Sequence, residues 1–170
     1  MDLRSFVREV PDFPQPGISF KDITPLLGNS AAFAHAVDRM VEPVAALLPT
    51  HVMGLESRGF IFGAAMAQKM GLGFVPARKP GKLPGRAFSE SYGLEYGNDA
   101  LEIHQDAFKP GDRVLIVDDV LATGGTAAAA RRLVERTGAQ PLALTLFIEL
   151  GFLPGREKLA GLPIFSVLRY

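Results

Sequence analysis

The sequence predicts an α/β fold with a mainly parallel sheet flanked by helices. A predicted strand, a loop and a run of helix-forming residues follow one another twice, over residues 51–70 and again over residues 114–135. The run VLIV at 114–117 is apolar without alternation, which is typical of a strand covered on both faces. In such folds ligands bind beyond the carboxyl ends of the strands, so the loops after these strands are the places to search.

Composition limits the classes of protein to consider. The 170 residues fit one domain, and 48% apolar with 21% charged residues is ordinary for a globular protein. The formal net charge of zero gives no reason to expect nucleic acid or an anionic membrane as a partner. The absence of cysteine excludes disulfides, thiol catalysis and cysteine-based zinc sites. The first residues do not resemble a leader and no run approaches a membrane span, so we expect a cytoplasmic protein.

The N-terminal forty residues predict small elements. Apolar residues at helical spacing over 3–10 predict a short amphipathic helix. Three prolines and a glycine over 11–17 then predict an extended, turning segment. Asn29 or Ser30 can cap the following helix, and Pro43 should kink or end it.

The next unit combines a strand at 51–55, a turn at 56–59 and an almost wholly apolar helix at 60–70. Arg58 lies in the turn, next to the expected helix start. The N-terminus of a helix favours anions, so this turn is a candidate anion site. A lone arginine at a helix start is also common as a surface residue, and the residues alone leave both interpretations open.

A strand at 73–78 leads into a basic loop, which we define as residues 78–86. Four cations alternate there with prolines and glycines, which rules out a helix or a central strand. They suit a compact polyanion under a closing lid, although a solvated basic loop is the simpler alternative. Residues 88–97 alternate with period two, which predicts a two-stranded flap that turns at Asn98 and Asp99 into 100–104.

Residues 114–126, VLIVDDVLATGGT, carry the strongest chemical signal. Asp118 and Asp119 follow the apolar run, and the glycine-rich turn 122–126 precedes a helix expected from Ala127. Backbone N–H groups in such a turn bind a phosphate, whereas adjacent carboxylates bind a diol or a hydrated metal. The composite target is a sugar phosphate, with or without a divalent cation. The alternative is a buried strand that ends in a solvated Asp-Asp turn.

The C-terminal part completes the alternation of strands and helices. The helix from Ala127 is expected to bury Ala130, Leu133 and Val134 and to end at Gly138. It is expected to expose its charged residues to water, namely Arg131, Arg132, Glu135 and Arg136. Residues 141–150 predict another buried strand, residues 154–159 a short turn or helix, and residues 164–168 a last strand.

Several segments resemble one known family. VLIVDDVLATGGT closely resembles the phosphoribosyl diphosphate (PRPP) motif of the type I phosphoribosyltransferases. PGISFKDITP, ESRGF, SYGLEYG and PGREKL resemble the adenine-specific members, and the resemblance covers almost the whole chain. It implies transfer of the 5-phosphoribosyl group from PRPP to adenine, which gives AMP and pyrophosphate in purine salvage, with Mg²⁺ bound through substrate and water and with a homodimer. It also implies a single domain over 1–170, with a hood from about 1–28 and 150–170 and a flap at about 79–104.

The resemblance also assigns roles to individual residues. It implies that Asp118 and Asp119 engage the ribose hydroxyls and that Glu95 handles the purine proton. It implies that the 5′-phosphate binds Ala122, Thr123, Gly124, Gly125 and Thr126. It implies that pyrophosphate binds Ser57, Arg58, Arg78, Lys79 and Lys82, with Arg78 able to serve the neighbouring subunit. It implies that adenine contacts Phe20, Lys21, Glu149 and Leu150.

Two departures from the family pattern concern the base rather than PRPP. Ser19 stands where an aliphatic residue is common, and Lys21 where arginine is frequent. A preference for hypoxanthine, guanine or xanthine therefore remains open, as does a non-catalytic PRPP sensor on the same fold. A dinucleotide dehydrogenase is disfavoured, because neither GxGxxG nor GxxxxGK[ST] occurs.

Overall fold

The computed structural model describes residues 1–94 and 97–170. The described chain divides into two compact units, Met1–Arg39 and Met40–Tyr170. We describe each unit by itself. None of the described helices combines the length and the apolarity that a membrane span requires.

The first unit contains a 3₁₀ helix, η1 (Leu3–Phe6), a hairpin of β1 (Arg8–Val10) and β2 (Phe20–Asp22), and the short helix α1 (Thr24–Leu27). The prediction of a helix over 3–10 is wrong beyond Phe6, because residues 8–10 pair antiparallel with β2. Helix α2 (Ser30–Val41) is capped by Asn29, whose Oδ1 accepts a hydrogen bond from the backbone N–H of Ala32 at 3.0 Å. It ends two residues before Pro43, as expected.

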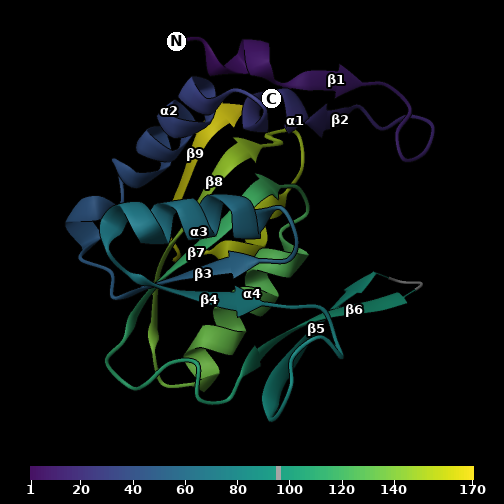
Figure 1. Ribbon diagram of the computed structural model, residues 1–170. Coiled ribbons are helices and arrows are strands. Elements are labelled where there is room, and N and C mark those ends of the chain that lie inside the picture. The colour runs from purple at the N-terminus through teal and green to yellow at the C-terminus, as the bar shows by residue number, and fades with distance from the viewer. Residues whose placement is uncertain (95–96) are drawn as a thin grey trace. The chain divides into compact units, whose positions relative to one another are not determined.

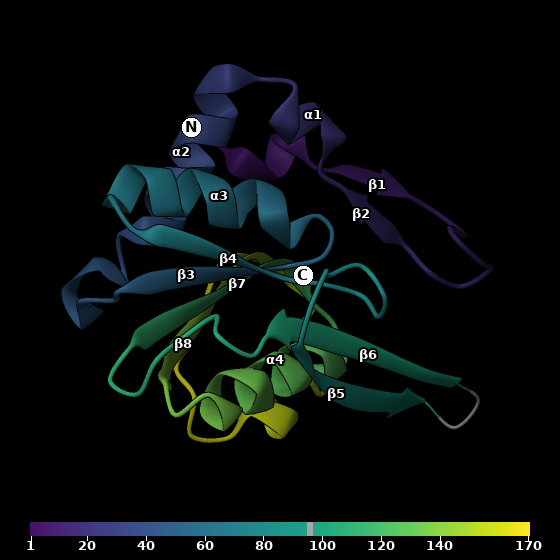
Figure 2. The ribbon, with the colours of Figure 1, turned by 60° about the horizontal axis from the view of Figure 1, so that its bottom comes forward.

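The second unit is built on a five-stranded sheet in which every pairing is parallel (Figure 1). Its strands, in the spatial order β4-β3-β7-β8-β9, are Gly73–Ala77, His51–Leu55, Arg113–Leu121, Gln140–Glu149 and Ile164–Arg169. Helices α3 (Gly59–Met70) and α4 (Gly125–Arg136) cover opposite faces (Figure 2). Two 3₁₀ helices, η2 (Ala45–Leu47) and η3 (Gly155–Leu159), complete the unit. The predicted fold class is confirmed.

The core lies along the two central strands. Val114, Leu115, Ile116 and Val117 of β7 are all fully buried, so the absence of alternation correctly predicted a strand covered on both faces. Phe62 of α3 stacks on Phe147 of β8, with ring centroids 5.6 Å apart. The buried sheet therefore holds the residues at the ends of its strands in fixed positions.

The flap is a hairpin of β5 (Ala87–Leu94) and β6 (Gly97–His104). The predicted turn at Asn98 and Asp99 is wrong, because Tyr92 pairs with Asp99 and the ladder continues to Leu94 and Gly97. Period-two alternation marks the strands of a hairpin, but it does not mark where one strand ends.

The base of the flap is attached to α4. Arg132 binds the Glu90 carboxylate at 3.0 Å, and Arg136 donates to the Ser89 carbonyl at 2.8 Å. Arg136 also lies over the Phe88 ring, 4.6 Å from its centroid. The prediction that the α4 arginines only face water is therefore wrong for this pair, because the flap packs along the helix.

Candidate functional site

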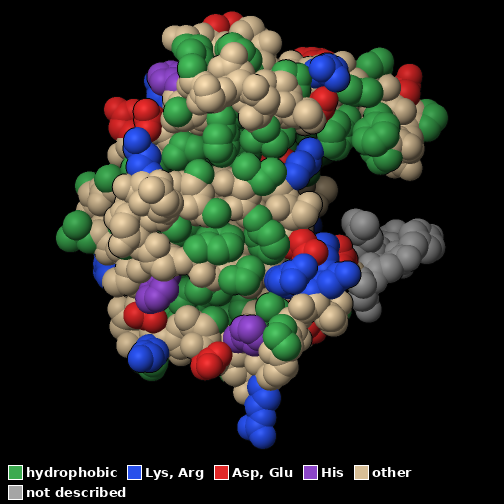
Figure 3. All heavy atoms as spheres, in the orientation of Figure 1, with side chains coloured by type: hydrophobic (Ala, Val, Ile, Leu, Met, Phe, Trp, Pro, Cys, Tyr) green, Lys and Arg blue, Asp and Glu red, His purple; other side chains and the backbone are tan. Residues whose placement is uncertain are grey.

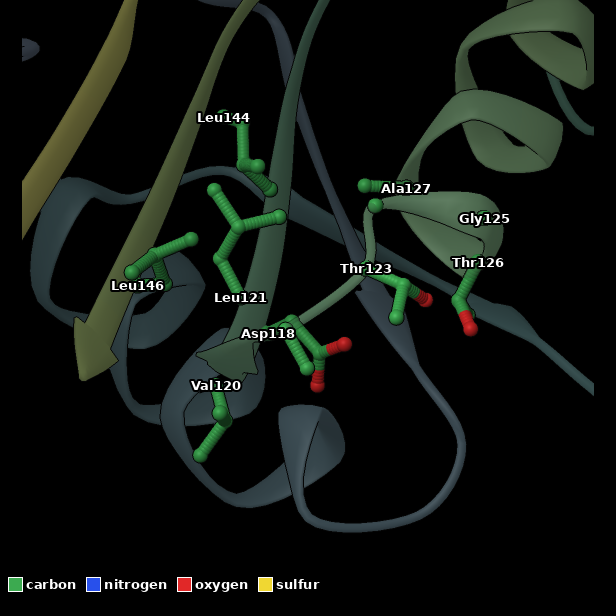
Figure 4. Close-up of a pocket in the computed structure, with 11 residues that line it drawn as sticks. Asp118, Val120, Leu121, Thr123, Gly125, Thr126, Ala127, Leu144 and Leu146 are labelled. Carbon is green, nitrogen blue, oxygen red and sulfur yellow. The ribbon is translucent and has the colours of Figure 1, made fainter. Parts of the chain in front are cut away.

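The turn 122–126 begins directly after β7 and includes the first two residues of α4, Gly125 and Thr126. Together with Asp118 it lines a cavity of about 80 Å³ (Figure 4). The Thr123 and Thr126 hydroxyls project from the turn in Figure 4. The N–H groups in the first turn of α4 have no intrahelical acceptor, and the helix dipole adds positive potential at the same place. The turn is thus suited to bind an anion of phosphate size.

Two glycines allow this turn to pack against η3. Gly124 has φ +84°, and a Cβ there would lie 2.4 Å from the Gly155 carbonyl oxygen. A Cβ on Gly155 would in turn lie 2.5 Å from the Ala122 carbonyl oxygen. Any side chain at either position would force the backbones apart, so the shape of the turn depends on η3.

Asp118 and Asp119 lie within β7, which continues to Leu121, rather than after the strand as the sequence suggested. Asp119 is 5% exposed, and its Oδ2 lies 2.7 Å from Arg58 Nε. The two groups are not aligned for a hydrogen bond. Within the described chain, Asp119 Oδ2 is therefore a buried acceptor to which no group donates a hydrogen bond. Its charge is balanced by Arg58, and its remaining capacity to accept a hydrogen bond is open to a ligand hydroxyl.

Asp118 packs against the N-terminus of α3. A Cβ on Gly59 would lie 2.9 Å from Asp118 Oδ1, and that oxygen accepts a hydrogen bond from the Asp119 N–H at 2.8 Å. Burial raises the pKa of the Asp118 carboxyl well above its usual range, and the adjacent Asp119 charge raises it further. A cation or a hydrogen-bond donor beside Asp118 would favour its charged form and oppose this rise in pKa.

The second candidate anion site is the start of α3. Arg58 is the N-cap residue of α3 and Ser57 is exposed just before it. The peptide bond between Glu56 and Ser57 is cis. Because β3 and β7 are adjacent and parallel, the Arg58–Asp119 ion pair joins the two candidate loops at the same edge of the sheet.

The basic loop begins beside the same edge. The Lys79 N–H donates to Glu56 Oε2 at 2.6 Å, and Arg78 Nε lies 3.5 Å from that oxygen. These contacts lower the pKa of Glu56, first through the Lys79 hydrogen bond. Lys82 is exposed, and its carbonyl accepts from Arg78 Nη1 at 3.4 Å. In Figure 3, basic and acidic side chains gather where Figure 1 shows the chain leaving β4.

Lys79 connects the basic loop to the flap. Its Nζ donates to the Tyr92 hydroxyl at 2.6 Å and to Asp99 Oδ2. Burial alone would lower the pKa of Lys79, but the hydrogen bonds with Asp99 and Tyr92 together outweigh it and raise that pKa. Tyr92 also packs on the turn, because a Cβ on Gly125 would lie 3.3 Å from its ring. The basic loop, the flap and the turn therefore meet at Tyr92.

The residues expected around the base are not brought together in one described unit. Phe20 and Lys21 belong to the first unit, where Lys21 Nζ lies 3.1 Å from Glu9 Oε2. In the second unit Glu149 is the last residue of β8 and Leu150 follows it, with its N–H donating to the Leu121 carbonyl at 3.0 Å. Glu95 lies outside the described residues. The assignments to adenine and to its proton remain predictions.

Sequence reasoning gave no site role to four residues that the structure places beside the predicted ones. They are Tyr92, Asp99, Gly155 and Arg156. Gly155 and Arg156 lie in the PGREKL segment, so the resemblance marked the region without indicating what it does. No local pattern predicts the pairing of Lys79 with Asp99, which lies 20 residues further along the chain.

Comparison with known proteins supports the same family. Residues 27–151 match the model of the phosphoribosyl transferase domain. The chain is 58% identical over 170 residues to the adenine phosphoribosyltransferase of Carboxydothermus hydrogenoformans, which covers all of both proteins. It is similar to the crystal structure of the Thermoanaerobacter pseudethanolicus enzyme of that name, with a TM-score of 0.97, 47% identity and 99% and 98% of the two chains covered.

A third similar protein is the adenine phosphoribosyltransferase of Saccharomyces cerevisiae in complex with an imino-altritol bisphosphate and adenine. It has a TM-score of 0.92 and 42% identity, with 98% and 96% of the two chains covered. Family model, sequence relatives and solved structures agree over nearly the whole length. The chain belongs to the phosphoribosyl transferase family and, within it, to the adenine phosphoribosyltransferases.

Proposed function

We propose that this protein transfers the 5-phosphoribosyl group from PRPP to adenine, which yields AMP and pyrophosphate and serves purine salvage. The observation that carries the proposal is one cavity in which the anion-binding turn 122–126 and the Asp118 carboxylate face the same space. That combination suits a phosphorylated sugar. Membership of the adenine phosphoribosyltransferases gives the acceptor base.

The 5′-phosphate is assigned to the backbone N–H groups of the turn and to the hydroxyls of Thr123 and Thr126. Asp118 and Asp119 are assigned to the ribose hydroxyls. A hydroxyl that donates to Asp119 Oδ2 would satisfy the buried acceptor described above. Binding energy from the phosphate, which is remote from the breaking bond, then orients the anomeric carbon toward the base.

Pyrophosphate is assigned to Ser57, Arg58, Arg78, Lys79 and Lys82. Cleavage of the anomeric C–O bond leaves positive charge on the ribose and negative charge on pyrophosphate, so fixed cations beside the leaving group lower the barrier. The basic side chains at this edge of the sheet support that role. The carboxylates of Asp118 and Asp119 stabilise the positive charge on the ribose.

We infer that Mg²⁺ accompanies PRPP. Among the described residues there is no group of three or more His, Cys, Asp or Glu side chains that can enclose a metal. Asp118 and Asp119 nevertheless offer the hard oxygens that Mg²⁺ prefers, and Mg²⁺ usually keeps several waters and substrate phosphates as ligands. The pair therefore fits a metal held through substrate and water. When bound, Mg²⁺ would neutralise charge on the pyrophosphate.

The base is assigned to Phe20, Lys21 and Leu150, with Glu149 at the border of the base pocket, and proton transfer at the purine is assigned to Glu95. We predict that Glu95→Gln slows the chemical step more than it weakens PRPP binding, because the amide cannot exchange the proton. Single-turnover kinetics separate the two effects. A variant with wild-type chemistry and weakened PRPP binding would remove Glu95 from this role.

We also propose a homodimer of single-domain subunits in the cytoplasm, with the hood at 1–28 and 150–170, the flap at 79–104, and Arg78 acting across the interface. Support for the interface comes from α3 and the edge strand β4. Ile61 on α3 is 40% exposed, and Phe60 packs edge-to-face on Phe74 of β4 with both rings half-buried. Figure 3 shows apolar side chains gathered over these elements. Sedimentation at several concentrations tests the dimer.

The decisive experiment measures AMP formation from adenine and PRPP with and without Mg²⁺, and repeats it with hypoxanthine, guanine and xanthine. We expect turnover with adenine and strong dependence on the metal. Turnover confined to the oxopurines would contradict the assignment of adenine. Binding of PRPP without release of pyrophosphate would favour a sensor over an enzyme.

A further inference from the structure

The carboxylate of Glu149 is occupied by protein groups. Glu149 is 3% exposed, and Arg156 donates to both of its oxygens, from Nε at 2.6 Å and from Nη2 at 2.7 Å. The Ser166 hydroxyl adds a third hydrogen bond at 2.9 Å. A bidentate pair of this kind fixes direction as well as distance. The carboxylate thus has little capacity left for a base.

Arg156 directly follows Gly155, whose backbone supports the turn 122–126. These are backbone–backbone contacts, and they leave no room for a Cβ at either glycine. The Gly155 carbonyl lies against Gly124, and the Ala122 carbonyl lies against Gly155. The far end of η3 is held by α4, because Arg131 donates to the Ala160 carbonyl at 2.8 Å. Both α4 and the end of β8 therefore hold η3 in place, α4 through Arg131 and β8 through Glu149.

We propose that the Glu149–Arg156 pair positions the phosphate-binding turn by holding the Gly155 backbone against residues 122–124. The pair contacts no part of the substrate in this assignment, so both are positioning residues. The inference deepens the proposed function and rests on it. Glu149 still borders the base pocket in the proposed function, but its carboxylate binds Arg156 and Ser166 and not the base.

Glu149→Gln is the first test. The amide keeps the size of the side chain but gives the Arg156 guanidinium only one oxygen, so η3 should loosen without leaving a buried charge unpaired. We expect the KM for PRPP to rise about tenfold or more, with the KM for adenine unchanged, since displacement of a positioning group by about 1 Å has effects up to a hundredfold. Ribose 5-phosphate should show the same loss in calorimetric titrations, which need no catalysis.

Gly155→Ala perturbs the other end of the contact and changes neither side chain of the ion pair. It should reproduce the selective loss of ribose 5-phosphate binding. Asp112→Asn is the matched control for lost stability: it removes a carboxylate that accepts from the Lys109 N–H at 2.8 Å, at the opposite end of β7. This control should lower the melting temperature without changing the KM for PRPP.

The outcomes separate this inference from the proposed function. If wild-type protein neither binds ribose 5-phosphate nor makes AMP, the proposed function fails. If wild-type protein does both and Glu149→Gln alters only the KM for adenine, or only the melting temperature, the positioning role is wrong. The positioning role is supported if Glu149→Gln and Gly155→Ala both raise the KM for PRPP and weaken ribose 5-phosphate binding, with the KM for adenine unchanged.

Discussion

The two anion-binding regions of this protein are held in place by different means. The turn 122–126 is made of backbone, and glycine contacts with η3 fix it before any ligand arrives. The pyrophosphate side is made of side chains, and three of its cations already face internal carboxylates: Arg58 with Asp119, Arg78 with Glu56 and Lys79 with Asp99. One region is preorganised, whereas the other must exchange partners when its ligand binds.

The two regions should respond differently when their ligands bind. A phosphate at the turn displaces no protein group, because helix N–H groups have no competing acceptor. A pyrophosphate beside Lys79 competes with Asp99 and Tyr92 on the flap. Ligands that carry only a 5′-phosphate should therefore bind without disturbing the flap, while pyrophosphate should release it.

The largest effect is expected where the two regions meet, at Asp118 and Asp119. Asp118→Asn combined with Asp119→Asn removes both negative charges beside the ribose and the ionic partner of Arg58, so kcat/KM should fall by about a thousandfold or more. The fold should persist, since Asn keeps the volume of Asp. Steady-state kinetics beside a melting curve measure both effects, and near-normal rates would remove the ribose assignment.

Asp118→Asn alone also tests the raised pKa. A folded-state pKa above the ordinary value of 3.8 means that the native protein binds the proton more tightly than the unfolded chain. The free energy of unfolding must then fall as pH rises above that value and toward the raised pKa. The neutral variant lacks this loss, so its stability should exceed that of the wild type increasingly as pH rises. A constant difference across pH would contradict the raised pKa.

The next effect concerns the backbone region alone. Gly124→Ala places a Cβ 2.4 Å from the Gly155 carbonyl and should shift the turn. We expect the KM for PRPP to rise about a hundredfold, because the donors no longer converge on the phosphate. Gly71→Ala is the control: Gly71 caps α3 with φ +67° and has nothing within 4 Å of its added Cβ. It should cost about 1–2 kcal/mol of stability with KM unchanged.

What the sequence predicted follows the same division. The turn and the buried strand that contains its two aspartates are contiguous, so one local pattern encodes the apolar run, the acids and the glycines together. The parallel sheet followed from the same kind of local signal. By contrast, a cation does not encode its partner: the Arg58–Asp119 and Glu149–Arg156 pairs exist only because strand ends and η3 meet in space.

The wrong element predictions have a similar origin. The segment 3–10 has helical spacing, yet its last three residues are a strand because β2 pairs with them. Asn98 and Asp99 favour a turn by composition, but cross-strand pairing with Gly93 and Tyr92 overrides that preference. Tertiary pairing decided both cases.

The smallest effect probes the side-chain region without touching the turn. Asp99→Asn removes the charge that competes for Lys79, and the side chains of this pair are 34% and 53% exposed, so the interaction contributes little. Exposed pairs contribute up to about 1 kcal/mol, which corresponds to pyrophosphate binding tighter by at most about fivefold. Titration calorimetry with pyrophosphate measures the change, and ribose 5-phosphate should bind as before.

Glu135→Gln serves as the matched control, because it removes the partner of Arg131 in an exposed pair on α4, 3.1 Å apart. Its pyrophosphate affinity should equal that of the wild type. Weaker pyrophosphate binding in Asp99→Asn would mean that Asp99 holds Lys79 in the binding position instead of competing for it. In that case both regions would be preorganised, one by glycine packing and the other by an internal ion pair, and the flap would not need to open for pyrophosphate.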